Sequence, residues 1–184
     1  MITIVDDIFD LFARFGSEGY GEDLSLEQHM LQSAALAQSL GASPNAVAAA
    51  LLHDIGYFLR ADAGGAADPG QDFEHEALGA AWLSRGFGEA VTAPVALHVE
   101  AKRYLCLVEP GYFDQLSDAS KLSLSVQGGV MNRAEAAAFE ALPTFDSAIL
   151  LRRCDDRGKD MAAEVRPLQS YRTLLVGCLR ESAD

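Results

Sequence analysis

The sequence predicts an all-α protein built as one domain. Hydrophobic residues recur at helical spacing through nearly the whole chain, and no segment alternates hydrophobic and polar residues over the length of a strand. Residues that begin and end helices separate these segments. The 184 residues can bury one continuous core, and neither an internal repeat nor a linker divides residues 1–184.

In the first half of the chain, three helical segments are set by residues that begin or end helices. Gly16 ends the first, Ser25 has capping-box spacing to Gln28 at the start of the second, and Pro44 stands in the first turn of the third. The three helices are expected over residues 5–15, 25–41 and 43–60. Residues 61–72 are small, rich in glycine and without hydrophobic anchors, which predicts a mobile loop.

Beyond this loop the helical periodicity continues. The pair Gly128-Gly129 breaks one helix, and Asn132 has capping-box spacing to Glu135 at the start of another. Longer helices are expected over residues 73–85, 88–104, 145–159 and 167–180.

The composition excludes several classes of protein. A net charge of −13 argues against a nucleic-acid partner, because binding to a phosphate backbone needs clustered Lys and Arg. No hydrophobic run approaches the roughly 18 residues of a membrane span, and the N-terminal segment lacks the basic start and cleavage site of a signal peptide. Three widely spaced cysteines, Cys106, Cys154 and Cys178, indicate reduced thiols. We therefore expect a cytoplasmic protein without a nucleic-acid or membrane partner.

All four histidines of the chain fall into one arrangement. A lone histidine on a hydrophobic helix face is usually a core residue, but these four lie on successive predicted helices, and an aspartate directly follows the second. A further aspartate, either Asp155 or Asp156, completes a set of six ligands. Six ligands exceed what one structural zinc ion needs, so the sequence predicts a pair of metal ions. The other five predicted ligands are His29, His53, Asp54, His75 and His98.

The basic residues cluster beside these ligands. Six of the 14 Lys and Arg residues lie in two short stretches, Lys102-Arg103 and residues 152–159. An acidic protein that concentrates its cations next to a metal site is a candidate for binding a small anion there.

The order His, His-Asp, Asp resembles the HD-domain superfamily of metal-dependent proteins, and two extra histidines between His-Asp and the last Asp mark its dinuclear members. The resemblance implies a helical bundle with a buried dinuclear metal site. In the oxygenase branch of the superfamily, which includes myo-inositol oxygenase, the last ligand is an Asp four residues before a Lys. Asp155 and Lys159 match that spacing, so the resemblance implies Asp155 as the sixth ligand.

Further segments are similar to a narrower family, the HD-domain mixed-valent di-iron oxygenases that cleave the carbon–phosphorus bond of α-hydroxyphosphonates. This resemblance implies two iron ions in the mixed-valent Fe(II)/Fe(III) state, O2 as co-substrate and a small organophosphonate substrate. It extends from residue 20 to residue 159. The matching segments are Tyr20-Gly21-Glu22 seven residues before His29, Lys102-Arg103-Tyr104-Leu105 after His98, residues 116–120 leading to Gln127-Gly128-Gly129, and residues 152–156.

The resemblance also implies which residues bind the phosphonate, and their spacing is consistent with that role. Lys102 lies four residues after His98, so both share one helix face. Arg152 and Lys159 lie three residues before and four residues after Asp155, which places all three on one face. Ser120 can donate from its hydroxyl near a helix start, where backbone amides also suit an oxyanion.

Two positions depart from the family pattern. A family tyrosine gates the metal and a glutamate recognises the substrate, which implies Tyr20 and Glu22 here; Tyr20 lies two residues before Glu22, where the family spacing is three. Tyr57 stands where the family often has a histidine, in the run His53-Asp54-Ile55-Gly56-Tyr57. Its aromatic face, together with the charge of Glu22, could accommodate a quaternary ammonium group.

The expected function is oxidative cleavage of a 1-hydroxy-2-(amino or trimethylammonio)ethylphosphonate to phosphate and glycine or glycine betaine. One alternative is a metal-dependent phosphohydrolase acting on a nucleotide or another phosphoester, in which the metals activate water. Another is a degenerate HD domain that senses a ligand, which would lack metal ligands, although none is missing here. Consumption of oxygen separates the first two.

Overall fold

A computed structural model of the chain describes residues 3–19, 24–65 and 72–180. The predictions for Tyr20 and Glu22 lie outside these residues, as does half of the loop predicted over residues 61–72. Within the described ranges the protein is helical and has no β-strand beyond two isolated bridges, which confirms the all-α prediction. The helices are α1 (Ile4–Phe15), α2 (Leu26–Ser39), α3 (Pro44–Leu52), α4 (Ile55–Asp62), α5 (His75–Leu83), α6 (Glu89–Val108), α7 (Tyr112–Gln115), α8 (Asp118–Val126), α9 (Arg133–Glu140), α10 (Phe145–Arg157), the 3₁₀ helix η1 (Leu168–Tyr171) and α11 (Arg172–Gly177).

The predicted capping residues begin their helices. Ser25 and Gln28 form the reciprocal contacts of a capping box at α2, and Asn132 and Glu135 do the same at α9. Pro44 occupies the first turn of α3, after the N-cap Ser43. These contacts satisfy amide groups that the first turn of each helix leaves without a partner.

The helix predicted over residues 43–60 is wrong as a single element, because the chain leaves the helical path at His53 and Asp54 and divides it into α3 and α4. The uninterrupted hydrophobic run before His53 carries no signal for this turn. The other differences concern helix ends. Three predicted helices end differently. The helix α6 continues to Val108, beyond the predicted end at residue 104, α10 stops at Arg157, before Lys159, and the last segment divides into η1 and α11.

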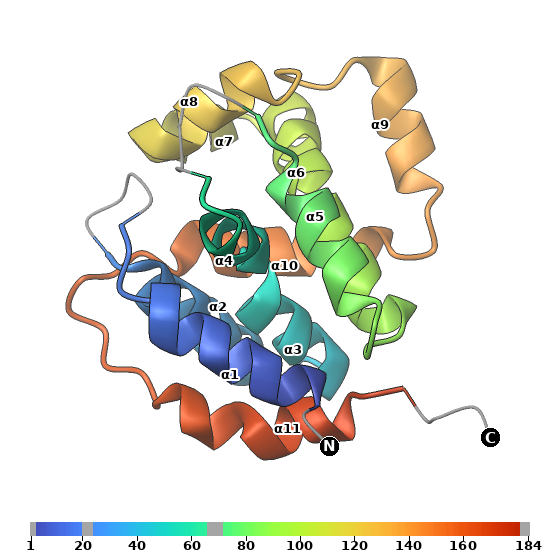
Figure 1. Cartoon of the computed structure of the whole chain (residues 1–184). Helices are drawn as coiled ribbons and strands as arrows, with labels where there is room; N and C mark the ends of the chain where they lie inside the picture. Colours follow the sequence, from blue (N-terminus) through green and yellow to red (C-terminus); the bar gives the residue numbers. More distant parts are fainter. Residues whose placement is uncertain (1–2, 20–23, 66–71, 181–184) are drawn as a thin grey trace.

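The helix α3 lies at the centre of the protein. Residues 47–52 are at most 2% exposed, so all sides of this short, alanine-rich helix are covered. It packs against α2, α6, α10 and α11, while α1 lies against α4 and α11 (Figure 1). The small side chains let neighbouring helices approach closely, and this brings the C-terminal end of α3 into the middle of the bundle.

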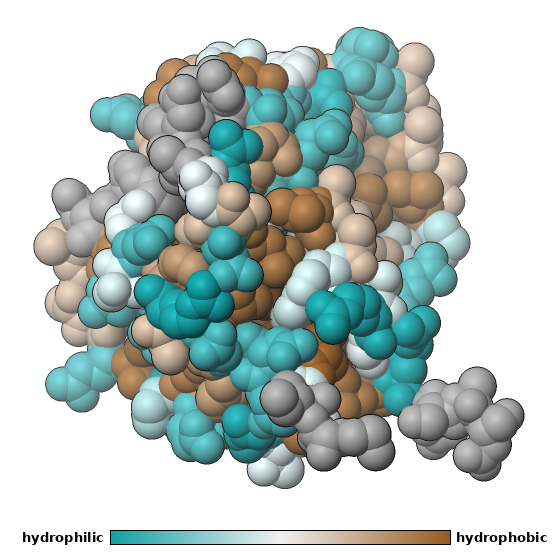
Figure 2. All heavy atoms as spheres, in the orientation of Figure 1, coloured by the Kyte–Doolittle hydropathy of each residue, from teal (hydrophilic) through white to brown (hydrophobic). Residues whose placement is uncertain are grey.

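The helices α7, α8 and α9 form a separate layer around the C-terminal half of α6 (Figure 1). Two small hydrophobic clusters lie beneath this layer, apart from the main core of the bundle. On the face shown in Figure 2, hydrophilic residues cover most of the surface, and hydrophobic residues reach it chiefly between α1 and α5. Among the described residues, no helix is long and hydrophobic enough to cross a membrane. All three cysteines are free thiols, as predicted.

Candidate metal centre and anion site

The six predicted ligands come from five places in the fold and converge in its interior. Each of the six is at most 6% exposed. Two groups of three side chains each have ligand atoms close enough to hold a metal ion, and Asp54 belongs to both. We call His29, His53 and Asp54 the first cluster, and Asp54, His75 and His98 the second cluster.

In the first cluster, Nε2 of His29 lies 3.1 Å from Nε2 of His53. Asp54 Oδ2 lies 3.7 Å and 3.3 Å from these two nitrogens. Asp155 adds a fourth group, because its Oδ1 lies 3.3 Å from His29 Nε2 and 3.9 Å from His53 Nε2. Two nitrogens bound side by side to one metal at about 2.1 Å are roughly 3.0–3.4 Å apart, so the spacing suits a shared ion.

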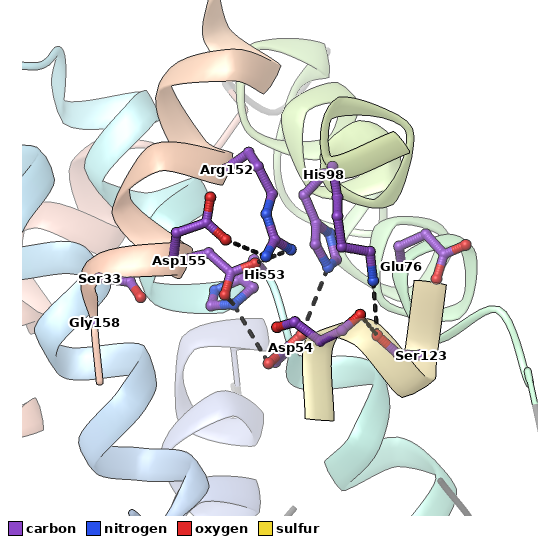
Figure 3. Close-up of polar contacts among 12 residues, drawn as sticks. Ser33, His53, Asp54, Glu76, His98, Ser123, Arg152, Asp155 and Gly158 are labelled. Atoms are coloured by element: carbon purple, nitrogen blue, oxygen red, sulfur yellow. Dashed lines mark hydrogen bonds and ion pairs between the residues drawn. The ribbon is translucent and has the colours of Figure 1, made fainter. Parts of the chain in front are cut away.

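The second cluster repeats this arrangement on the other oxygen of Asp54. Nε2 of His75 and Nε2 of His98 lie 3.1 Å apart, and Asp54 Oδ1 lies 3.3 Å and 3.7 Å from them. Figure 3 shows Asp54 between His53 and His98, with a carboxylate oxygen toward each side. A carboxylate in this position can bridge two metal ions. Two histidines and one carboxylate with further positions open form the ligand set typical of non-haem iron oxygenases.

The outer nitrogens of the imidazoles fix how the rings face the centre. Nδ1 contacts a backbone carbonyl in three cases, at Gly158 for His29 (2.9 Å), at Ala50 for His53 (2.9 Å) and at Val95 for His98 (2.8 Å). A carbonyl oxygen can only accept, so Nδ1 of these rings carries the proton and Nε2 is left for a metal.

Two glycines allow the backbone to approach the ligands. A Cβ at Gly56 would lie only 2.0 Å from the carbonyl oxygen of His75, so α4 and the start of α5 touch through backbone atoms. A Cβ at Gly158 would meet the hydroxyl of Ser33 at 2.6 Å, although the carbonyl of Gly158 must reach His29. Any other residue at either position would push a ligand helix away from the centre.

The electrostatics of the six predicted ligands favour a cation. Burial disfavours the charged form of Asp155, but Arg152 and the facing imidazoles hold its pKa well below the usual range. Burial also opposes a charged His53, and the carboxylate of Asp54 outweighs this effect and raises the pKa of His53 to about 9. A metal ion would therefore replace a proton at His53 and take over its partner carboxylates.

A second group of buried polar side chains lies beside the metal ligands, where α6 meets α8. The ammonium of Lys102, which is 3% exposed, donates to the hydroxyl of Ser123 at 2.7 Å and to Oε1 of Gln127 at 2.6 Å. Lys159 donates to the hydroxyls of Ser117 and Ser120, at 3.2 Å and 3.1 Å. Ser123 and Ser117 were not among the predicted site residues, since a serine on a polar helix face gives no signal of its own.

The three cations Lys102, Arg152 and Lys159 converge, and we call them the cationic cluster. Burial and the charge of Arg152 lower the pKa of Lys102 to about 7, and the charge of Lys159 acts in the same direction. Cations that repel one another in a buried place are expected where an anion is to be bound.

Arg152 is held in place by contacts on each of its three nitrogens. Nη1 donates to Asp155 Oδ2 at 2.7 Å (Figure 3). Nη2 donates to Asp156, and Nε donates to the hydroxyl of Tyr112 at 3.1 Å. Asp155 therefore turns one oxygen to the guanidinium and the other to His29 and His53. Asp156 contacts Arg152 and the hydroxyl of Tyr112, which leaves Asp155 as the aspartate that faces the imidazoles.

Tyr57 lies next to the second cluster. Its ring is tilted by 33° against the imidazole of His75, with the ring centres 4.6 Å apart, and Phe73 packs edge-on against it at 5.1 Å. Burial raises the pKa of the Tyr57 hydroxyl, and the carboxylates of Asp54 and Asp155 add to this shift, which keeps the hydroxyl protonated. Tyr57 thus provides an aromatic wall beside a metal ligand.

Comparison with known proteins places this centre in a family. Residues 26–123 match the HD domain. The chain is 44% identical over 183 residues to a protein of Gimesia maris named hydroxymethylphosphonate dioxygenase, which covers 97% of this chain and 89% of the relative. The chain belongs to the HD-domain phosphonate oxygenase family.

Two other relatives of this HD-domain oxygenase differ in what their names say. A protein of Leisingera caerulea, named [1-hydroxy-2-(trimethylamino)ethyl]phosphonate dioxygenase (glycine-betaine-forming), is 42% identical over 158 residues, covering 85% of this chain and 81% of the relative. An uncharacterised protein of Acanthamoeba polyphaga mimivirus is 33% identical over 188 residues, covering 100% of this chain and 85% of the relative. The family resemblance predicted from the sequence is confirmed.

Proposed function

We propose that this protein binds two iron ions, in a mixed-valent Fe(II)/Fe(III) state, and uses O2 to cleave the carbon–phosphorus bond of a 1-hydroxy-2-(amino or trimethylammonio)ethylphosphonate. The products are phosphate and glycine or glycine betaine. One O2 balances the reaction, because the four electrons lost when the hydroxylated carbon becomes a carboxylic acid reduce that molecule. The names of two relatives support oxidative cleavage over the phosphohydrolase alternative.

The observation that carries this proposal is the position of the cationic cluster beside the two metal clusters. Six protein ligands, His29, His53, Asp54, His75, His98 and Asp155, would hold the irons, with Asp54 between them. The ligand set of the second cluster leaves coordination positions open, as oxygen chemistry requires. Bound iron would supply the redox chemistry with O2.

The protein's own residues would bind and orient the phosphonate. Lys102 and Lys159 donate to hydroxyls one turn apart on α8, and they would exchange some of these contacts for phosphonate oxygens. The hydroxyl of Ser120 would donate to another oxygen. Arg152 uses three of its five N–H groups on Asp155, Asp156 and Tyr112, so two remain for the anion. Fixing the phosphonate fixes the neighbouring C1 hydrogen relative to the metals.

The aromatic wall formed by Tyr57 and Phe73 supports a substrate with a cationic substituent on the carbon next to C1. A trimethylammonium group is attracted to aromatic faces and has no N–H to donate. Under this proposal Glu22 would add a negative charge for that substituent and Tyr20 would gate access to the metal.

Oxygen consumption by anaerobically purified, iron-loaded protein tests the proposal. Three substrates that differ only in the substituent on C1 are compared: hydroxymethylphosphonate, its aminomethyl analogue and its trimethylammoniomethyl analogue. We expect O2 uptake and phosphate release in equal amounts, fastest with the cationic substrates. Phosphate release under strict anaerobiosis would contradict oxygenation, and a preference for hydroxymethylphosphonate would contradict the assignment of the cationic substituent.

A further inference from the structure

The four imidazoles of the metal centre differ in the group that contacts their outer nitrogen, Nδ1. His29, His53 and His98 direct Nδ1 at backbone carbonyls. Nδ1 of His75 instead lies 3.2 Å from Oε2 of Glu76, which is a carboxylate. Among the described residues, His75 is thus the one metal-facing histidine with an acidic side chain at its outer nitrogen.

The carboxylate of Glu76 is buried where it approaches His75. The residue is 8% exposed, and its Oε2 is buried and makes no hydrogen bond in the part of the chain that the structure describes, so the 3.2 Å approach of His75 Nδ1 is an ion-pair contact. Leaving a carboxylate oxygen buried costs free energy unless a donor faces it, and His75 Nδ1 is the group that does so. The attraction between the Glu76 carboxylate and the His75 ring therefore offsets part of the cost of burying this oxygen.

The charges around the two clusters explain why the carboxylate lies here. The first cluster has Asp155 in addition to its share of Asp54. The second cluster has only its share of Asp54, so an ion there receives less negative charge from its direct ligands. In Figure 3, Glu76 and Asp155 lie on opposite sides of Asp54. Glu76 thus supplies a second negative charge to the second cluster, which has no carboxylate other than Asp54.

We propose that Glu76 is a positioning residue that strengthens His75 as an electron donor and so favours the more oxidised state of the metal ion in the second cluster. A carboxylate that accepts the Nδ1 proton raises the basicity of the imidazole and fixes its orientation. The inference rests on the proposed function only in taking both clusters to hold iron. Its consequences are seen in iron binding and in the redox potential, which are measured without substrate.

The substitution Glu76→Gln isolates the charge, because the amide keeps the size of the side chain and an oxygen that can accept from His75. Glu100→Gln is the matched control. Glu100 has a buried Oε2 and lies close enough to add to the rise that burial causes in the pKa of Glu76. Within the described residues it makes no hydrogen bond or ion pair with a metal-facing histidine.

Anaerobic iron titration and a redox titration followed by electron paramagnetic resonance provide the measurements. For Glu76→Gln we expect the affinity for one of the two irons to fall about tenfold, the low end of the usual effect of such substitutions. If this loss falls on the ferric form alone, the midpoint potential rises by about 59 mV, the one-electron equivalent of a factor of ten. Glu100→Gln should retain the wild-type values.

Equal shifts in both variants would overturn the proposal, because they would show that any nearby negative charge suffices. Unchanged affinity and potential in Glu76→Gln would also overturn it. A protein that binds two irons with the expected shifts and still cleaves no phosphonate would contradict the proposed function and leave this inference standing.

Discussion

Replacing Lys102 with methionine should stabilise the protein while it weakens substrate binding. Burial and the charges of Arg152 and Lys159 lower the pKa of Lys102 from 10.5 to about 7, so the charged ammonium is unfavourable in the folded protein. Methionine keeps most of the hydrocarbon stem and removes the charge. Stability and binding are therefore expected to move in opposite directions, as at other functional sites that contain strain.

The gain in stability follows from two opposing contributions. Each pKa unit corresponds to about 1.4 kcal/mol. The shift in the pKa of Lys102 from 10.5 to about 7 therefore sets an upper bound of roughly 5 kcal/mol on the gain in the free energy of unfolding. Against this, Ser123 and Gln127 lose a charged donor, which costs on the order of 1–3 kcal/mol. We expect a net rise of about 1–3 kcal/mol in the free energy of unfolding at pH 7.

The gain should depend on pH in one direction. The pKa of Lys102 is lower in the folded protein than in the unfolded chain, so the penalty is fully present below about pH 7 and disappears above pH 10.5. The stability advantage of Lys102→Met should therefore shrink as the pH rises from 7 toward 10.5. Urea denaturation at several pH values measures it.

Substrate binding should suffer in the same variant. Removing one partner of a buried charge pair costs about 2–5 kcal/mol, which is roughly 30-fold to several thousand-fold in KM for the phosphonate. Iron content should stay at the wild-type level, because Lys102 contacts α8 and touches no metal ligand in the described structure.

Lys121→Met serves as the matched control for Lys102→Met. Lys121 lies on α8, and within the described residues its ammonium donates to the backbone carbonyl of Asp114 and lies 5.8 Å from the ring centre of Phe113. It should change neither KM nor stability by more than about 0.5 kcal/mol. A Lys102→Met protein less stable than the wild type at pH 7 would refute the claim that the charged ammonium destabilises the folded protein. An unchanged KM would refute the role of Lys102 in substrate binding.

Three further outcomes are expected. Asp54→Ala should abolish loading of both irons, because each oxygen of Asp54 faces one cluster; retention of one iron, seen by metal analysis, would contradict bridging. Gly56→Ala should destabilise the protein by about 2–4 kcal/mol in thermal unfolding and lower iron content, because the new Cβ would meet the carbonyl of His75. Substrate affinity should fall as the pH rises above about 7, where free Lys102 loses its proton, and Lys102→Arg should flatten this KM profile; a pH-independent wild-type KM would contradict it.

The sequence predicted the all-α class, the positions of most helices and a set of four histidines and two aspartates that converge in the structure. Capping residues indicated where helices begin, because they act within one helical turn. The histidines indicated the shared site, because they lie on successive predicted helices. The turn at His53 and Asp54 could not be predicted from the hydrophobic run before it; after this turn Gly56 lies against the carbonyl of His75, 19 residues further along the chain. Only the assembled bundle shows why a helix must break there.

The surroundings of the ligands were harder to predict than the ligands. Tyr112 and Ser123 resemble ordinary helix residues in the sequence, and their roles appear only when α7 and α8 fold back on α6 and α10. Arg152 was predicted to bind substrate, and the structure shows that it also holds Asp155 in place. One side chain can serve the metal and the anion together, and spacing along a helix does not distinguish the two roles.

The two parts of the site are supported by different parts of the fold. The predicted metal ligands come from helices that share the main hydrophobic core, whereas Ser120, Ser123 and Gln127 belong to α8 and its C-cap, which pack over a separate small cluster. A change in α8 can therefore alter the anion site while the metal geometry is retained. Substitutions in α8 that change KM without changing iron content would follow directly from this division.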